Sequence, residues 1–214
     1  PLHAFDRREV RGDRIVVRHA KEGEVFITLD DQEHTLNEAD LLIGDAERGI
    51  ALAGIMGGQN SEIRDDTSEL ILEAANFKSA SIRRTASRLG IRTDSSARFE
   101  KSLDPESASI ASKAFCVLMQ SLDPGCQVAS ALVDIAAPIT KPPTITLPFS
   151  LVDSRLGVTL EREQIETYLT RLGFEIRRQN DGLEVMVPSW RASKDVSIAA
   201  DLIEEIGRSF GYDN

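Results

Sequence analysis

Apolar residues in the first third of the chain come in short runs that are separated by polar turns. Runs of this length, rich in β-branched residues, predict strands rather than helices. The strands expected on this basis span residues 14–20, 24–30, 41–45 and 50–54.

The stretch 51–77 organises the rest of the pattern, because an apolar strand breaks into glycines and returns as a second apolar strand. Glycine is used where a backbone must approach something closely, either another strand or a ligand. The second apolar run carries Glu73 among small and apolar neighbours. The residues alone therefore predict a bulged hairpin whose glutamate faces an edge, with a ligand site as the alternative.

After Phe77 the apolar residues recur at helical spacing. This pattern predicts one helix that ends at Gly90 and a longer helix over about 106–122. Between them, 92–105 shows no clear period and is predicted to be a structured loop. One more strand is expected at 128–136, where the first domain ends.

A proline-rich stretch at 137–148 holds four of the eight prolines, which favours an extended connector and places a domain boundary near residue 141. Beyond it the pattern predicts a short strand at 144–148, a helix over 161–172, a hairpin around Asp181 and a last helix over 196–209.

The predicted fold class is α+β, with two domains in sequence. Residues 1–140 are expected to form a mixed-sheet domain, and residues 141–214 a small winged-helix-like α+β domain. A winged-helix shape alone is a weak reason to expect DNA binding, since fold does not carry function. The second half has no basic recognition face, so no DNA partner is expected.

Composition is that of a soluble globular protein, with 41% hydrophobic and 28% charged residues among 214. A cytoplasmic location is expected. No apolar run approaches the ~20 residues of a membrane helix, and no signal segment stands at the start, so no membrane partner is expected. Cys116 and Cys126 lack metal-ligand spacing and are expected to be buried, reduced thiols. The chain starts at Pro1 rather than Met, and we expect a piece of a longer chain.

The formal net charge of -10 argues against indiscriminate attraction to nucleic acid, because phosphate binding depends on Lys and Arg. One segment departs from this acidic background. Its basic side chains, against only Asp94 and Glu100, are Arg83, Arg84, Arg88, Arg92, Arg98 and Lys101. A solvated helix face and a phosphate-facing role both remain open for it.

Two sets of residues could carry chemistry. In the first, Asp201, Glu204 and Glu205 share one helix face, with Asp195 just before the helix. Like charges on one face destabilise a helix unless something offsets them, and a hard cation such as Mg²⁺ does so through oxygen ligands. The alternative is a solvated acidic face.

The second set combines an imidazole, a carboxylate, a hydroxyl and close-approach backbone, which together could bind a small polar ligand. Its members are His3, Glu73, Thr93 and the glycines of 54–58, among them Gly57 and Gly58. The sequence has none of the common nucleophile-elbow, phosphate-loop or zinc-protease motifs.

Six motifs, in order along nearly the whole chain, resemble the beta chain of bacterial phenylalanyl-tRNA synthetase. They are PLHAFD (1–6), AGIMGG (53–58), ILEAANF (71–77), RTDSSARFEKSLDP (92–105), VPSWR (187–191) and DLIEEIGRSFGYDN (201–214). The resemblance implies that residues 1–140 are most of a tRNA-editing domain without its upstream part, and that residues 141–214 are the winged-helix-like module that contacts the catalytic alpha chain.

The resemblance also implies an editing reaction, the hydrolysis of misattached tyrosine from tRNA(Phe) by water. An apolar pocket alone separates amino acids that differ by one hydroxyl only about a hundredfold, so a second site must find the hydroxyl. By resemblance Glu73 recognises that hydroxyl and His3 lies near the ester. The backbone at Gly57 and Gly58 approaches the substrate. The pocket wall contains Thr93 and, where the family usually has alanine, Ser95.

For the second domain the resemblance implies magnesium ligands shared with the alpha chain, at Asp195, Asp201, Glu204 and Glu205. RASKDV carries two more residues between Arg191 and Asp195 than the usual family pattern. The implied assembly is an alpha2beta2 complex that uses ATP, bound outside this chain, to attach phenylalanine to tRNA(Phe). The competing hypothesis is a structural module that contacts the alpha chain and has lost editing.

Overall fold

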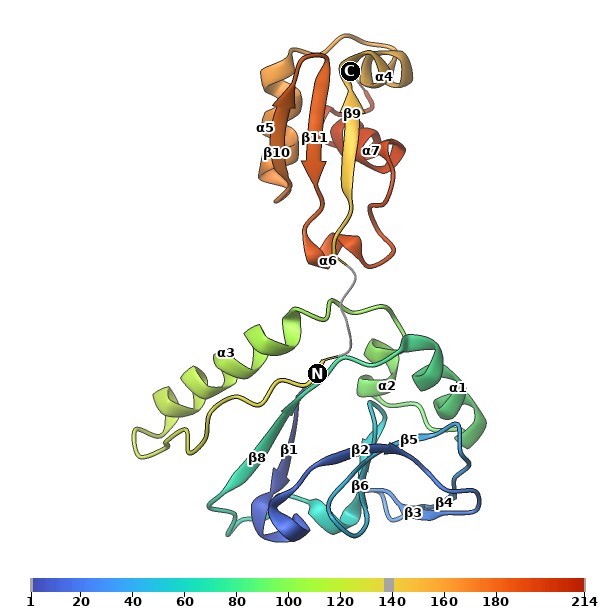
Figure 1. Ribbon diagram of the computed structural model, residues 1–214, viewed down its shortest axis with the longest axis vertical. Coiled ribbons are helices and arrows are strands. Elements are labelled where there is room, and N and C mark those ends of the chain that lie inside the picture. Colours follow the sequence, from blue (N-terminus) through green and yellow to red (C-terminus); the bar gives the residue numbers. More distant parts are fainter. Residues whose placement is uncertain (1, 137–140, 214) are drawn as a thin grey trace. The chain divides into compact units, whose positions relative to one another are not determined.

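The computed structural model describes residues 2–136 and 141–213, in two compact units, Pro1–Val133 and Asp134–Asn214 (Figure 1). The boundary predicted near residue 141 borders on residues 137–140, which lie outside this description. Each unit is considered by itself below.

The first unit is built from small antiparallel sheets. A four-stranded sheet has the order β2 (Val16–His19), β5 (Leu41–Gly44), β6 (Gly49–Leu52), β7 (Met56–Gly57). Two further pairs are β3 (Val25–Ile27) with β4 (Glu33–Thr35), and β1 (Leu2–Asp6) with β8 (Leu70–Ala74). Every strand pairing among the described residues is antiparallel, so the α+β class is confirmed, whereas the mixed sheet expected for this domain is replaced by antiparallel ones.

The bulged hairpin predicted for 51–77 is wrong. β8, which carries Glu73, pairs with β1 rather than with β6. The glycine stretch instead turns into β7, which folds back on β6. Sequence spacing gives the strands but not their partners, because β1 lies about seventy residues away from β8 along the chain.

Helices and short turns complete the first unit, and their bounds differ from the predictions in two places. The helices are α1 (Ser79–Leu89), α2 (Asp94–Phe99) and α3 (Ser107–Leu122), and the 3-10 turns are Arg7–Glu9, Arg11–Asp13 and Gln59–Ser61. The predicted end of α1 is confirmed, since Gly90 closes it at φ 71°.

The first difference is α2, which lies inside the segment predicted to be a loop. A reciprocal capping box starts it, because Thr93 Oγ1 accepts from the Ser96 N–H at 3.0 Å and Ser96 Oγ accepts from the Thr93 N–H at 2.9 Å. The second difference is 128–136, which is not a strand. Its residues are exposed, and no described strand pairs with them.

Two hydrophobic clusters join these elements. One packs Phe26 and Leu42 of the sheets and Ile55 of the turn before β7 against α1 and α2, and the other packs Phe5 of β1 against Ile50 and its neighbours. Phe77, just after β8, contacts both clusters. The end of β8 is therefore held by burial of its apolar neighbours as well as by the ladder.

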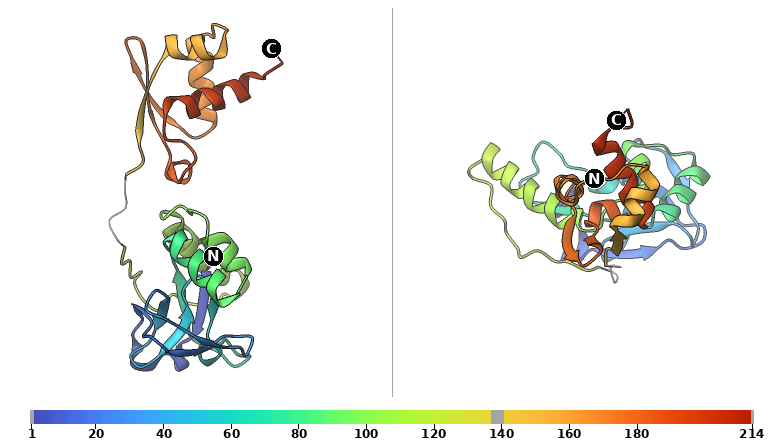
Figure 2. Two further views of the ribbon diagram at one scale, coloured as in Figure 1. Left: turned by 90° about the vertical axis from the view of Figure 1, so that its right-hand side faces the viewer. Right: turned by 90° about the horizontal axis from the view of Figure 1, so that it is seen from above.

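The second unit is a three-stranded antiparallel sheet in the order β10 (Glu175–Gln179), β11 (Gly182–Met186), β9 (Thr144–Pro148). Its helices are α4 (Phe149–Leu156), α5 (Arg162–Arg171), α6 (Ser189–Ala192) and α7 (Ala199–Phe210). Helices α4, α5 and α7 lie on one face of the sheet over a single core (Figure 2). The predicted hairpin and both predicted helices are confirmed, and α4 and the short α6 are additional helices that spacing did not indicate.

Buried Asp40 connects α1 to the turn before β5 through hydrogen bonds and an ion pair. Its carboxylate accepts from Thr85 Oγ1 at 2.7 Å and from the Asn37 N–H at 2.9 Å, and it pairs with Arg88. Asp40 is 1% exposed, and removing it leaves the buried Thr85 hydroxyl, the half-buried Asn37 N–H and the Arg88 guanidinium without this acceptor.

We predict that Asp40→Ala lowers the free energy of unfolding by about 2–4 kcal/mol, measured by urea denaturation and circular dichroism. The control is Glu47→Ala, which removes an exposed ion pair with Arg11 and should cost less than about 1 kcal/mol. Equal losses in the two variants would show that Asp40 is not the fastening point.

Candidate functional site

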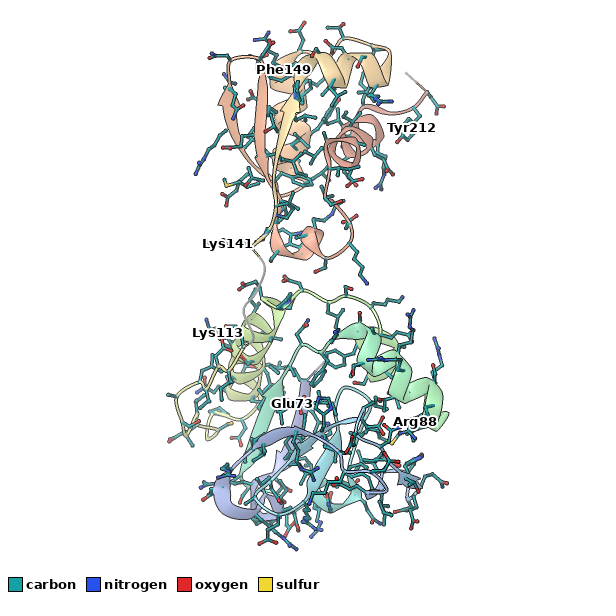
Figure 3. All side chains as sticks on the ribbon, turned by 45° about the vertical axis from the view of Figure 1, so that its right-hand side comes forward. Glu73, Arg88, Lys113, Lys141, Phe149 and Tyr212 are labelled. Carbon is teal, nitrogen blue, oxygen red and sulfur yellow. The ribbon has the colours of Figure 1, made fainter. Side chains whose placement is uncertain are left out.

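The ladder between β1 and β8 places His3 directly opposite Glu73. Side chains that stand opposite in an antiparallel pair point to the same face of the sheet, with their Cβ atoms about 4.5–5.5 Å apart. Figure 3 marks Glu73 within the first unit. The structure thus brings together an imidazole and a carboxylate that are seventy positions apart in the sequence.

Gly57 lies against the His3 ring. A Cβ atom at Gly57 would lie 2.7 Å from His3 Cε1 and 2.9 Å from Leu29 Cδ1, closer than real side chains come. At Gly58 the obstacle is backbone, because a Cβ atom would lie 2.8 Å from the Ile50 carbonyl oxygen. The absence of a side chain at Gly57 is therefore what lets the imidazole rest on bare backbone, and its absence at Gly58 lets the chain pass close to the Ile50 carbonyl.

Thr93 and Ser95 join α2 to the glycine turn. Thr93 Oγ1 donates to the Ile55 carbonyl at 2.7 Å, and Ser95 Oγ donates to the Gly54 carbonyl at 3.2 Å. Both hydroxyl protons are thus engaged with the backbone of the turn that leads to Gly57. The turn connects these residues to His3, and their hydroxyl oxygens retain acceptor capacity for a ligand.

Glu73 is the one carboxylate of this set, and it forms no hydrogen bond or ion pair with another described residue. Burial raises its pKa to about 7. Burial also lowers the pKa of His3, so that the imidazole is neutral at neutral pH. The site therefore presents a partly buried carboxyl that needs a donor and an imidazole with a free acceptor nitrogen.

The four acidic residues predicted as metal ligands line one cavity of about 480 Å³ in the second unit, together with Arg191 and Arg208. Asp201 accepts from the Ser197 N–H at 2.7 Å and the Ile198 N–H at 3.0 Å, which caps the start of α7 and lowers its pKa. Asp195 and Glu205 accept hydrogen bonds from an arginine side chain instead.

Arg191 holds two of the remaining carboxylates. Its guanidinium donates to Glu205 at 2.7 Å and to Asp195, and it lies 5.6 Å from the centre of the Phe174 ring. Arg208 also reaches Glu205, at 3.2 Å. Spacing along α7 could not identify Arg191, because this residue comes from α6 and not from the acidic helix. The signal in the sequence was a basic residue four positions before Asp195.

Within the described residues, no three Asp, Glu, His or Cys side chains come together as a ligand set for a metal ion. Of the four predicted ligands, Glu204 alone is exposed and accepts no hydrogen bond from a described residue, since the other three already accept from Arg191 or from backbone. The donor set does not fit Mg²⁺ within this chain, because a cation there would have to displace Arg191. A magnesium site shared with another chain stays a prediction.

Two domain families match this chain. Residues 1–124 match the family described as B3/4 domain, and residues 145–212 match the tRNA synthetase B5 domain. The chain is 42% identical to the phenylalanine–tRNA ligase beta subunits of Solibacter usitatus and of Clostridium tetani, over 100% of its own length in each case. It spans 28% and 27% of the length of those curated relatives.

A crystal structure of an N-terminal fragment of the phenylalanyl-tRNA synthetase beta subunit from Pyrococcus horikoshii has a similar fold. The TM-score is 0.52 at 14% identity, over 99% of this chain and 60% of that one. Among the described residues, no helix has both the length and the apolar character needed to cross a membrane.

We predict that Glu73 makes the first unit less stable as pH rises from about 4.5 to about 7. The pKa of Glu73 is raised on folding, so its protonated form stabilises the fold fully below the unfolded pKa, and this contribution is lost as pH rises through the folded pKa. The loss is about 3 kcal/mol. Comparing unfolding free energies of the parent and Glu73→Gln across this range isolates it, because the variant lacks the titrating group.

The control is Glu69→Gln. Glu69 lies just before β8, and its exposed carboxylate pairs with Arg7, so this variant should keep the parent's dependence of unfolding free energy on pH. A Glu73→Gln profile parallel to that of the parent would contradict the prediction.

For the second unit we predict that Arg191→Met lowers the free energy of unfolding by about 2–4 kcal/mol, because it leaves the buried Glu205 without its closest partner. Arg208→Met removes a more exposed partner of the same carboxylate and should cost less than about 1 kcal/mol.

Millimolar Mg²⁺ should leave the melting temperature of the parent unchanged. A clear rise would show that the cation displaces Arg191.

Proposed function

This chain belongs to the phenylalanine–tRNA ligase beta subunit family, as a B3/4 domain followed by a tRNA synthetase B5 domain, and on that premise we propose that its first unit hydrolyses tyrosine wrongly attached to tRNA(Phe). The observation that carries the proposal is Glu73, a partly buried carboxyl with no hydrogen bond to a described residue, which stands opposite His3, whose ring lies against Gly57.

Selection follows from the need of Glu73 for a donor. Tyrosine brings a phenolic O–H that can donate to the carboxyl, whereas phenylalanine offers only ring C–H groups. A site built to hydrogen-bond a hydroxyl strongly disfavours an analogue without it, because its own polar group is then left unpaired. The same unpaired group thus favours tyrosine and spares the correct product.

Hydrolysis itself needs water, a proton acceptor and a held ester. His3 is neutral at neutral pH because burial lowers its pKa, so its imidazole can accept a proton from an attacking water. The water oxygen bonds to the ester carbonyl carbon, the bond to the ribose oxygen breaks, and the proton passes to that oxygen. Backbone at Gly57 and Gly58 and the wall at Thr93 and Ser95 hold the ester. No covalent protein nucleophile takes part.

We propose that the second unit supports assembly with the alpha chain, in an alpha2beta2 complex that ligates phenylalanine to tRNA(Phe) with ATP in the cytoplasm. The B5 match and the ligase relatives support this role. The alternative, a structural module without editing, shares this second half and differs only at the His3–Glu73 pocket.

The test is deacylation of Tyr-tRNA(Phe) by the complete complex of alpha and beta chains. Glu73→Ala is expected to lower kcat/KM for hydrolysis about 30- to 100-fold, because it removes the hydrogen bond that binds the phenol. Phenylalanine ligation should be unchanged, and it reports that the complex is intact. Glu69→Gln, an exposed carboxylate in the same unit, serves as control. Hydrolysis by Glu73→Ala at the parent rate would contradict editing at this site and favour the alternative, a structural module without editing.

A further inference from the structure

Helix α3 is the longest helix among the described residues, and it leaves most of its apolar surface uncovered. Ten of its sixteen residues are apolar, and Lys113 (marked in Figure 3) is its only charged residue. A helix that is apolar on several sides is normally buried. The only residue of α3 that the structure buries is Ser112, although the shorter helices α1 and α7 bury large apolar side chains.

The uncovered side chains of α3 lie beside the side that contacts the sheet. The helix contacts β8, and its partly buried residues, among them Phe115 and Met119, lie along one side. Ile110, Val117 and Leu118 are more than half exposed, and their spacings of seven and eight residues place them along the adjacent side. One side of α3 is therefore packed, and an apolar side next to it faces solvent.

The exposed apolar surface continues in the segment that follows α3. The chain turns at Asp123, whose carbonyl accepts from the Cys126 N–H at 2.9 Å, and runs on as 127–136 (Figure 1). No backbone hydrogen bond joins 127–136 to another described residue. This segment thus has the residue types of a strand but no described partner strand. Its large apolar side chains are all exposed, and they are Val128, Leu132, Val133 and Ile135.

Residues 107–136, which we call the apolar stretch, differ from the rest of the exposed surface. Among the described residues six large apolar side chains are more than 60% exposed, and five of them belong to the apolar stretch, Tyr212 being the sixth. Single exposed apolar residues are ordinary, whereas a concentration of them marks a contact surface. Three of the thirty residues are charged, against 28% of the whole chain. So low a charge is typical of a permanent contact rather than a transient one.

The relatives indicate the source of a covering segment. This chain aligns over its full length with two beta subunits that are 42% identical to it, but it spans only 28% and 27% of them. The larger part of each relative therefore lies outside the aligned region. A contact within one polypeptide avoids the loss of translational and rotational freedom that joins two separate molecules. A second copy of this chain is disfavoured by the net charge of -10 that each copy would bring.

We propose that a segment of the beta subunit outside residues 1–214 covers the apolar stretch. It adds a strand to 128–136 through backbone hydrogen bonds and packs apolar side chains on the exposed side of α3. Strand addition satisfies the backbone groups and the side chains of an extended apolar segment together. The proposal is independent of editing, because it rests on the family membership and on the exposed surface of residues 107–136.

The test is hydrogen–deuterium exchange, followed by mass spectrometry, on this chain and on the complete beta subunit. We expect the amides of 128–136 to exchange at close to the unprotected rate in this chain and about 100-fold more slowly in the complete subunit, because the added strand hydrogen-bonds them. The control is β11, which pairs with strands on both sides and should be protected equally in the two proteins.

A double change on α3 tests the side-chain contact. Leu118→Gln with Leu122→Gln should leave the exchange of this chain unchanged, because both side chains are exposed in it. The same change should speed the exchange of 128–136 in the complete subunit about tenfold, because it removes buried apolar area there. Val17→Gln is the matched control. Val17 is similarly exposed on β2, outside the apolar stretch, so its replacement should leave the exchange of 128–136 unchanged in both proteins.

Equally fast exchange of 128–136 in the two proteins would overturn the proposal. Protection in this chain that increases with its concentration would overturn it in favour of a second copy, and protection that requires added alpha chain would do so in favour of that partner. Protection in this chain at every concentration would show that the chain covers the stretch itself. A complete subunit that protects 128–136 but does not hydrolyse Tyr-tRNA(Phe) would contradict only the editing proposal, so the two tests fail separately.

Discussion

The antiparallel pairing of β1 with β8 is the constraint on which the first unit depends. An isolated two-stranded ladder is marginal in water, so this one must be held from outside. Phe5 and Ile71 pack it against the four-stranded sheet, and α3 contacts β8. At the far end, buried Asp6 accepts from Arg8 and from Thr67 Oγ1, which secures the chain on both sides of the ladder. The opposition of His3 and Glu73 is a product of these contacts.

Three carboxylates of the first unit show how burial separates structural from chemical roles. Asp6 and Asp40 are each 1% exposed, and each is surrounded by donors. Hydrogen bonds from Arg8 and Thr67 hold the pKa of Asp6 far below its usual range. Glu73 is largely buried and accepts no hydrogen bond from a described residue, and its pKa moves in the opposite direction. The other two buried carboxylates are held by donors, so this one is available to bind something else.

Local signals in the sequence predicted most elements but not their partners. Periodicity and caps gave α1 with its end at Gly90, and α3, α5, α7 and the second-unit hairpin, and the motif resemblance to the beta chain is confirmed. Local signals do not predict pairing between strands far apart in the sequence. They place Glu73 in a hairpin with its near neighbours, whereas its strand pairs with β1. They also predict a strand at 128–136, where no described strand is available to pair. Spacing predicted the acidic face of α7. It could not predict that Arg191, which donates to Glu205 on this face, comes from another helix.

The contact between the His3 ring and Gly57 means that one volume of space serves either an imidazole or a side chain at position 57, but not both. Any replacement of this glycine competes with His3 for its place, although the two residues belong to different strands and position 57 contributes no reactive group. Under the proposed editing function, a single change at this chemically inert position would abolish proofreading in a lineage, with the histidine and the glutamate still present in its sequence. A survey that scored only those two residues would count such a protein as active.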